Sequence, residues 1–300
     1  MELGLRYQHA SWVGDNDWNP RVNLSYNLGE STTIRAGWGI FTQHHAIDKL
    51  NMVDEDYNYY GSESSMHYMI GLEHRFPIGI NCRLDAYFKK LSDLRPRYIS
   101  YRYNTDTSPE NSHDRIRLEP DWGESKGIEI YLNQTIGDEF KWWFNYSYSI
   151  VRENINGKLL PREMDQRHAI NINISYQPDD LWAINLSWYY HSGWPYTQET
   201  VNIISQNTDG GYNWTWAPGP IYGSRFPAYH RMDIRVSRYI KVGDGRISLF
   251  LEVRNLYDQQ NLRQYAYSKV TILSSDEYTF DKEPNYWLPR LPSLGISWEF

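Results

Sequence analysis

Two stretches of this sequence combine aromatic rings with guanidinium groups, a combination that suits the binding of a small ligand. Residues 211–216 read Gly-Tyr-Asn-Trp-Thr-Trp, and Tyr222 and Arg225 follow shortly after. Ring faces stack on sugars or on a ligand's aromatic groups, and a guanidinium pairs with an anion. The alternative is that these rings pack against other loops. The candidate ligand contacts are Trp122, Tyr212, Trp214, Trp216, Tyr222 and Arg225.

The second stretch precedes Trp122 and is rich in Arg and Tyr. Such a cluster can hold an anionic ligand, and solvated packing within the loop is again the alternative. Its members are Arg95, Arg97, Tyr98, Tyr101, Arg102 and Tyr103.

Residue types that bind metals occur at His44-His45 and at Asp54-Glu55-Asp56. Adjacent residues of a strand point to opposite faces, so both imidazoles reach one ion only from a loop. The acidic run also lacks the ligand spacing of a calcium loop. We therefore expect a polar surface loop here, with no metal and no cofactor. The single cysteine, Cys82, excludes an intrachain disulfide and a cysteine-based zinc site.

Patterns that would support an enzyme are weak. His168 is expected on the outward face of a strand, and no nucleophile motif surrounds the serines of the neighbouring strands. Pairs of carboxylates suitable for glycoside hydrolysis could be assembled in many ways, so they carry no information. We expect a protein without enzymatic activity.

Composition narrows the class of protein. The 300 residues are 40% hydrophobic and 16% aromatic, with a mean hydropathy of -0.70. The aromatic content is unlike that of a disordered chain, and no apolar run reaches the roughly 20 residues of a membrane-spanning helix. The formal net charge of -7, without a basic stripe, argues against nucleic acid as a partner. The opening residues, MELGLRYQHA, lack the features of a signal peptide.

Apolar residues recur at every second position along most of the chain, which is the pattern of β-strands. In the stretch from Phe140 to Ile150, for example, the even positions are all aromatic or aliphatic. Short connections alternate with long ones, which predicts an up-and-down antiparallel meander with the long loops at one end. About twelve strands are expected, near 2–9, 20–28, 32–43, 65–76, 80–91, 125–136, 140–153, 167–177, 181–197, 228–241, 246–257 and 286–300.

The tight turns also predict which residues face one another across the strands. A two-residue turn at Gly243-Asp244 places Asp233 opposite Arg254 and Arg235 opposite Glu252. A three-residue turn at 77–79 places Glu73 opposite Arg83. Opposite charges in such cross-strand positions stabilise a sheet by roughly 0.2–1 kcal/mol per pair. We interpret these three pairs as structural ion pairs on the polar face.

The pattern favours a sheet that faces lipid on one side and water on the other. The apolar face is nearly free of charge at mid-strand, and aromatic residues mark the strand ends, as in the girdles of membrane barrels. The sequence therefore predicts an all-β, antiparallel, up-and-down transmembrane β-barrel, with Cys82 on the lipid-facing side. A soluble β-sandwich, whose core strands also alternate, is the alternative.

Several motifs, in this order, are typical of one family. They read Asp-Gln-Arg-His-Ala-Ile-Asn-Ile at 165–172, His-Ser-Gly-Trp-Pro-Tyr-Thr at 191–197, Tyr-His-Arg-Met-Asp-Ile-Arg-Val at 229–236 and Leu-Glu-Val-Arg-Asn-Leu-Tyr-Asp at 251–258. The chain ends in Leu-Pro-Ser-Leu-Gly-Ile-Ser-Trp-Glu-Phe at 291–300. On these residues the whole chain resembles the C-terminal part of a TonB-dependent outer-membrane receptor.

The resemblance implies a fold and a function. Family members carry a signal peptide, an energy-coupling motif, a plug domain and a barrel of 22 strands; this chain shows none of the first three and about twelve of the strands. Residues 1–300 are thus expected to be the C-terminal portion of such a barrel in the outer membrane of a Gram-negative bacterium. Its expected partners are outer-membrane lipid, a plug domain, the TonB energy-coupling complex and a small-molecule nutrient ligand.

The resemblance also implies the kind of cargo, which is a scarce nutrient such as a ferric siderophore, haem, cobalamin or an oligosaccharide. Twelve strands can also close on themselves, so a self-closed passive outer-membrane channel is the alternative. A soluble β-rich binding protein or hydrolase is a third hypothesis.

Overall fold

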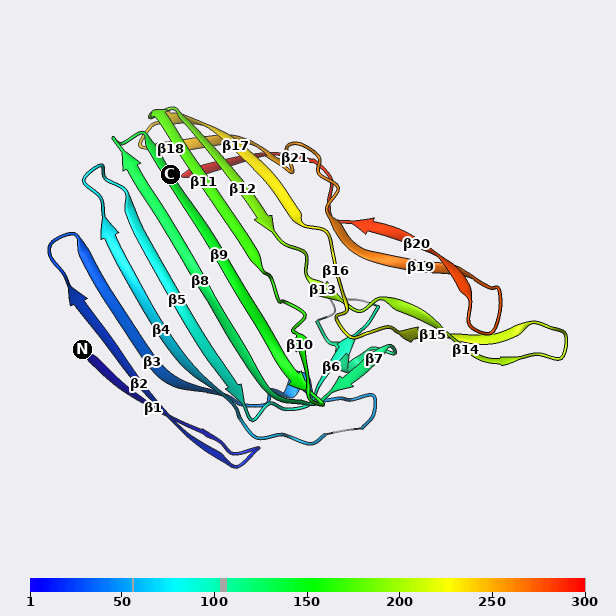
Figure 1. Cartoon of the computed structure of the whole chain (residues 1–300). Coiled ribbons are helices and arrows are strands. Elements are labelled where there is room, and N and C mark those ends of the chain that lie inside the picture. Colours follow the sequence, from blue (N-terminus) through cyan, green and yellow to red (C-terminus); the bar gives the residue numbers. More distant parts are fainter. Residues whose placement is uncertain (56, 103–106, 300) are drawn as a thin grey trace.

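The computed structural model describes residues 1–55, 57–102 and 107–299, and twelve of its strands form one continuous antiparallel sheet in chain order (Figure 1). A short thirteenth strand, β10 (Lys158–Pro161), pairs with β9. The twelve are β1 (Glu2–Ala10), β2 (Asp15–Asn27), β3 (Thr32–Gln43), β4 (Glu63–Arg75), β5 (Asn81–Ser92), β8 (Pro120–Ile136), β9 (Phe140–Ile155), β11 (His168–Asp179), β12 (Trp182–His191), β17 (Tyr229–Val242), β18 (Gly245–Arg254) and β21 (Leu291–Glu299).

The sheet is a strongly curved wall that does not close on itself. Strands β1 and β21 form its two edges, and the described residues contain no ladder that joins them. The curvature follows from the twist of long antiparallel strands. Within the described part of the chain, no helix has the length and the apolar character needed to cross a membrane. The only helical elements described are the single turns η1 (Ile47–Lys49) and η2 (Pro109–Asn111).

Five short connections between neighbouring strands of the sheet, at 28–31, 76–80, 137–139, 180–181 and 243–244, lie at one end of the sheet, and the long connections lie at the other, which we call the loop end (Figure 1). At the tight turns, Gly79 and Gly243 have φ of 85° and 63°, a left-handed conformation that side chains with a Cβ rarely adopt. The predicted up-and-down meander of about twelve strands is confirmed.

The register predicted from the turns is confirmed where the ladders extend. Val242 pairs with Gly245 and Arg235 with Glu252, and Glu73 pairs with Arg83. The last pair of the β17–β18 ladder is Ile234 with Val253. Register is this well specified because a slip of one residue would turn every apolar side chain to the other face.

The ladder therefore ends before it reaches Asp233 and Arg254. Among the described residues these two form no ion pair with each other. Arg254 Nε instead lies 2.6 Å from Glu252 Oε1 on the same strand, and Asp233 Oδ2 lies 2.9 Å from Arg231 Nη2. Asp233 also accepts a hydrogen bond from the Asn255 N–H, at 2.9 Å. The chain turns away here because Asn255 has a positive φ of 54°.

Three of the long connections expected as loops contain hairpins of their own. These hairpins are β6 (Arg97–Ser100) with β7 (Arg115–Leu118), β14 (Glu199–Gln206) with β15 (Tyr212–Pro218), and β19 (Leu262–Ile272) with β20 (Tyr278–Tyr286). The two residues of β13 (Pro195–Tyr196) also pair with β16 (Ser224–Arg225). Figure 1 shows β14–β15 and β19–β20 projecting away from the sheet.

Three strand predictions were too long at their loop ends. The segment expected at 181–197 is interrupted after His191, the segment expected at 246–257 ends at Arg254, and the segment expected at 286–300 begins at Leu291. The first break precedes Pro195, which cannot donate to a ladder, and the second is at the positive φ of Asn255.

The apolar row of the sheet does not face a second layer. On β21 the alternating residues Leu294 and Ile296 are 82% and 68% exposed. The buried apolar cluster lies instead at the loop end, where Ile99, Leu118, Ile155 and Tyr222 pack together. A sandwich would bury the apolar row against another sheet, so the described structure excludes the sandwich alternative.

Candidate functional site

A cleft of about 630 Å³ lies at the loop end, and we call it the loop cleft. Its wall combines acidic and basic side chains with two indole rings. The residues that matter for its chemistry are Lys49, Glu63, Arg95, Arg97, Tyr98, Glu110, Arg162, Glu163, Trp194 and Trp287. Five strand-to-strand connections contribute to it, so the cleft exists only once the sheet has brought their ends together.

A buried carboxylate holds two of the arginines of the cleft. Glu153, at the end of β9, is 1% exposed. Its Oε2 accepts a hydrogen bond of 2.5 Å from Arg97 Nη1, and its Oε1 lies 2.9 Å from Arg162 Nε. Because a buried charge must be paired, this arrangement fixes the positions of two guanidinium groups from different connections.

Arg95 is bound less completely than these two. Its Nη1 lies 3.5 Å from Glu63 Oε2, is buried, and has no hydrogen-bond partner among the described residues. Lys49 Nζ lies 3.6 Å from Glu110 Oε1, and that oxygen also lacks a hydrogen bond within the described ranges. Arg95 and Lys49 are therefore held by longer charge contacts than Arg97 and Arg162.

A second buried carboxylate, Asp165, ties the connections to the sheet. It is fully buried and accepts hydrogen bonds from Arg167 Nε at 3.0 Å, from the Val151 N–H at 2.7 Å, and from Arg225 Nη2. Arg225 Nη1 also donates to the carbonyl oxygens of Asp165 and Gly193, at 2.7 and 3.1 Å. Arg225, expected as a ligand contact, thus directs its donors to the protein itself.

Tyr222 is part of the buried apolar cluster. It is 6% exposed, adopts a positive φ of 51°, and its backbone N–H donates to Thr197 Oγ1 at 3.1 Å. Its hydroxyl donates to Glu163 Oε2 at 3.4 Å. Burial raises the pKa of Tyr222 well above its usual value. Through Glu163, which lines the cleft, the hydroxyl of Tyr222 connects the buried cluster to the cleft.

The remaining aromatic candidates lie away from the cleft. Trp216 packs edge-on against Tyr267 and Phe280, with ring centroids 6.1 and 5.8 Å apart, so it joins the β14–β15 and β19–β20 hairpins. Trp214 stands edge-on to Trp216 at 5.6 Å and is partly exposed. Tyr212 pairs with Gln206 at the outer end of its hairpin, and Trp122 lies on β8 opposite Asn154.

The Arg–Tyr stretch divides between two environments. Arg95, Arg97 and Tyr98 line the loop cleft. Arg102 lies 3.5 Å from Glu199 on β14, and burial raises the pKa of that carboxyl. Tyr101 is stacked by the Arg102 guanidinium at 5.8 Å, and Tyr103 lies outside the described residues.

Sequence reasoning did not single out Lys49, Arg162, Trp194 or Trp287 as site residues. Trp194 falls within the 191–197 motif, which was read only for family resemblance. Lys49, Arg162 and Trp287 lie in connections whose sequences contain no motif. Their position in the cleft results from contacts between segments far apart in the chain.

The histidines and acidic residues that the sequence analysis considered together as metal ligands do not form one group in the structure. His45 is buried, and the Tyr60 N–H donates to its Nδ1 at 3.2 Å. Asp54 is bound by Arg115 and Asn51, and those hydrogen bonds lower its pKa. Asp56 lies outside the described residues. His44 separates from this group and approaches two aspartates of β2.

Ion pairs follow the polar face of the sheet. Glu73 accepts a hydrogen bond of 2.7 Å from Arg35, and Arg83 lies 4.0 Å from Glu73 and 2.6 Å from Asp85. Near the other edge, Arg235 lies 3.8 Å from Glu252. One face of the wall is therefore charged and the other apolar. This division defines the class of protein, which is a transmembrane β-barrel of the outer-membrane type.

A family model described as "TonB dependent receptor-like, beta-barrel" matches residues 1–256. The chain belongs to this family of TonB-dependent receptors. The ferric enterobactin receptor of Pseudomonas aeruginosa is 24% identical over 216 residues, which cover 62% of this chain and 28% of that receptor. The ferrienterobactin receptor of Escherichia coli K12 is 23% identical over 248 residues, covering 71% and 32%. The chain thus spans about a third of the length of its curated relatives.

Solved structures show the same fold. A mutant ferric enterobactin receptor from Pseudomonas aeruginosa in complex with enterobactin aligns with 99% of this chain and 43% of its own, with a TM-score of 0.59 and 16% identity. The resemblance at this identity concerns the fold alone.

Proposed function

We propose that this chain is the C-terminal portion of a larger receptor barrel that takes up a ferric siderophore across the outer membrane of a Gram-negative bacterium. Two observations support the assignment of a larger barrel. The sheet has two open edges among the described residues, and open edges are not tolerated in lipid. The chain also matches about a third of the length of receptors that are themselves named for ferric enterobactin.

The proposed ligand class is based on the side chains that line the loop cleft. A ferric siderophore with acidic iron-binding groups is an anion, and such an anion pairs with guanidinium and ammonium groups in a partly dry cleft. Arg95 and Lys49 both line the cleft, and their contacts with Glu63 and Glu110 are long, at 3.5 and 3.6 Å. Trp194 and Trp287 offer ring faces beside these charges.

The receptor's other partners follow from the same proposal. The charged face of the wall, with pairs such as Glu73–Arg83 and Arg235–Glu252, is the surface that a plug domain would meet inside the barrel. Transport would use energy delivered through the TonB complex, and the apolar face would contact outer-membrane lipid. The role proposed for the chain is binding and transport without enzymatic activity.

Ligand binding is tested with the full chain in detergent micelles, with ferric enterobactin as the probe. Binding is expected to quench tryptophan fluorescence saturably, because Trp194 and Trp287 line the cleft. Arg95→Gln is expected to weaken binding about 10- to 100-fold, from a charge-assisted contact of about 1.5–3 kcal/mol. The control is Arg246→Gln, near the tight-turn end. Quenching that does not saturate, or that is equal in the two variants, would contradict the assignment.

The orientation in the membrane is tested on intact cells that export the chain. Trypsin added outside is expected to cleave the connections at the loop end, for instance after Lys49, and to spare the tight turn between Lys241 and Arg246. Cleavage at that turn with a protected loop end would refute the proposed orientation.

A further inference from the structure

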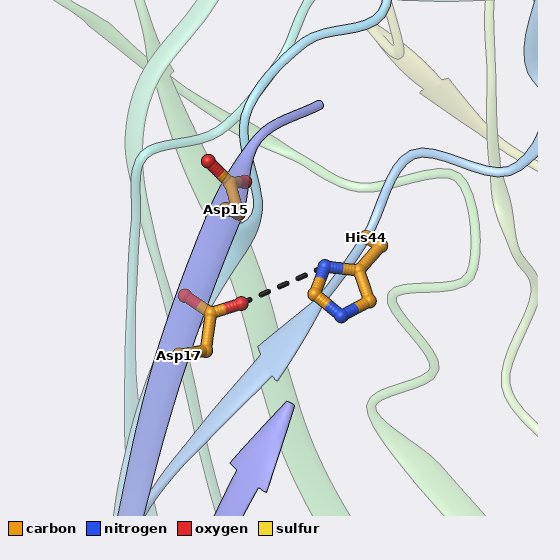
Figure 2. A group of neighbouring side chains, drawn as sticks. All are labelled: Asp15, Asp17 and His44. Carbon is orange, nitrogen blue, oxygen red and sulfur yellow. Dashed lines mark ion pairs between the residues drawn. The ribbon is translucent and has the colours of Figure 1, made fainter. Parts of the chain in front are cut away.

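Three side chains that can ligate a metal meet where β2 begins and β3 ends. Asp15 and Asp17 are alternate residues of β2, and His44 follows the last residue of β3 (Figure 2). One ligand atom of each residue lies within 4.8 Å of those of the other two. The group lies at the loop end but outside the wall of the loop cleft.

The contact between His44 and Asp17 has the geometry of two ligands of one ion. The two atoms, Nδ1 and Oδ2, are 3.5 Å apart (Figure 2), which is long for a hydrogen bond between them. Two ligands placed about 2.1 Å from a tetrahedral ion are about 3.4 Å apart. The observed spacing therefore leaves room for an ion between the ring and the carboxylate.

Buried acceptors on this face of β2 lack donors. Asp17 Oδ2 is buried and has no hydrogen-bond partner among the described residues. Two positions further along the same face, Asn19 is 1% exposed, and its Oδ1 is likewise without a partner in the described ranges. Buried acceptors without donors are costly, and a cation beside Asp17 removes that cost for the charged one.

Ser62 holds one of the three ligands, Asp15, in place. The backbone N–H and the Oγ–H of Ser62 donate to Asp15 Oδ2 at 2.6 and 2.8 Å. Outer partners of this kind orient a ligating carboxylate. Ser62 Oγ also lies 2.7 Å from His44 Nδ1. An ion bound at Nδ1 replaces this ring contact, and both hydrogen bonds from Ser62 to Asp15 are kept.

We propose that Asp15, Asp17 and His44 bind a divalent transition-metal ion, with Zn²⁺ as the ion that fits best. Two carboxylates and one imidazole are ligands that zinc accepts, and their two negative charges balance the ion. Three protein ligands leave a fourth position for water. The bound ion links β2 to the connection 44–62, so it fastens that connection to the sheet.

Zinc binding is measured on the untagged full chain in detergent by competition with a fluorescent chelator. One Zn²⁺ per chain is expected to bind, and Asp17→Asn and His44→Gln are each expected to lower the affinity more than tenfold. Asp17→Asn removes a ligand whose Oδ2 accepts no hydrogen bond, so the fold is retained. The matched control is His168→Gln, whose ring contacts Tyr146 on the sheet.

A second measurement reports on the linkage. Zn²⁺ is expected to slow tryptic cleavage after Lys49 at least severalfold in the unmodified chain and in His168→Gln, and to have no effect in Asp17→Asn. Equal zinc affinity in all variants would overturn the proposal. So would preferential binding of Ca²⁺ over Zn²⁺ at these residues, because calcium takes oxygen ligands and does not require the imidazole.

Discussion

Replacement of Asp165 by asparagine is expected to release the connections at the loop end while the sheet stays intact. The carboxylate is fully buried and accepts hydrogen bonds from Arg167, from Arg225 and from the Val151 N–H. Asparagine has the same shape but no charge, and its amide nitrogen would point toward a guanidinium group. Two charge-assisted hydrogen bonds, at about 1.5–3 kcal/mol each, are weakened together.

The expected cost is about 3–5 kcal/mol, because removal of one partner leaves buried charges without compensation. This cost falls on local opening of the loop end and not on the sheet, since the carboxylate joins the end of β9 and the residue before β11 to β16. Local opening is governed by its own free energy. A loss of about 3 kcal/mol or more corresponds to roughly a hundredfold faster amide exchange or beyond.

Hydrogen exchange followed by mass spectrometry, on the full chain in detergent, measures this effect. Peptides covering 193–197 and 222–226 are expected to exchange faster in Asp165→Asn, and peptides from the middle of β9 are expected to be unchanged. Asp138→Asn, in an exposed tight turn at the opposite end, serves as the matched control. Unchanged exchange at 193–197 in a folded Asp165→Asn chain would refute the argument that this carboxylate fastens the connections.

Three further outcomes follow from the structure. At Gly295 an added Cβ would overlap the Phe250 ring, which also stacks on the Arg235 guanidinium at 3.8 Å. Gly295→Val is therefore expected to lower the free energy of unfolding by about 1–3 kcal/mol. Thermal unfolding in detergent measures this loss, and equal stability of Gly295→Val and Gly211→Ala would contradict it. Burial raises the pKa of Glu199 above its unfolded value of 4.5, so the folded hairpin favours the protonated carboxyl; the resulting stabilisation is full below about pH 4.5 and is lost as the pH rises through the raised pKa. The protection of the β14 amides, measured relative to their exchange in the unfolded chain at the same pH, is therefore expected to fall above that range in the unmodified chain and to be independent of pH in Glu199→Gln. Protection that is independent of pH in both chains would contradict this expectation. In planar bilayers the chain alone is expected to give no steady pore, because β1 and β21 leave the wall open; a stable unitary conductance would instead support the self-closed channel.

The loop end consists of separate packed units with different tasks. Glu153 holds two arginines of the cleft, Asp165 holds Arg225 of β16, and Trp216 joins two projecting hairpins. Lys282 adds to the second unit, since its Nζ lies 3.8 Å from the Tyr265 ring and donates to Tyr196 Oη at 3.0 Å. Many of the residues that look suited to ligand binding are therefore engaged in holding the connections together.

Much of the sheet could be read from the sequence because its determinants are local. The alternation of apolar and polar residues sets which face each side chain takes. A tight turn such as Gly243-Asp244 then fixes the register of the strands on both sides, as the pairing of Arg235 with Glu252 shows. Local chemistry also limits the strands, and the break before Pro195 was missed because the apolar alternation continues past it.

The site could not be read in the same way. Tyr222 and Arg225 have the residue types of ligand contacts, but Tyr222 is buried against Ile99 and Arg225 is paired with Asp165, partners more than 50 residues away in the sequence. His44 was grouped with Asp54 by proximity in the chain, whereas the structure places it beside Asp15 and Asp17.

By itself, the sequence determined the approximate number of strands in the main sheet, the two faces of that sheet and the register at the tight turns, because each of these depends on neighbouring residues and a period of two. Only the tertiary structure decided which polar groups of the long connections meet, which are satisfied and which stay unpaired. Those contacts join residues with no shared local pattern, and they form only after the sheet has brought the ends of its strands together.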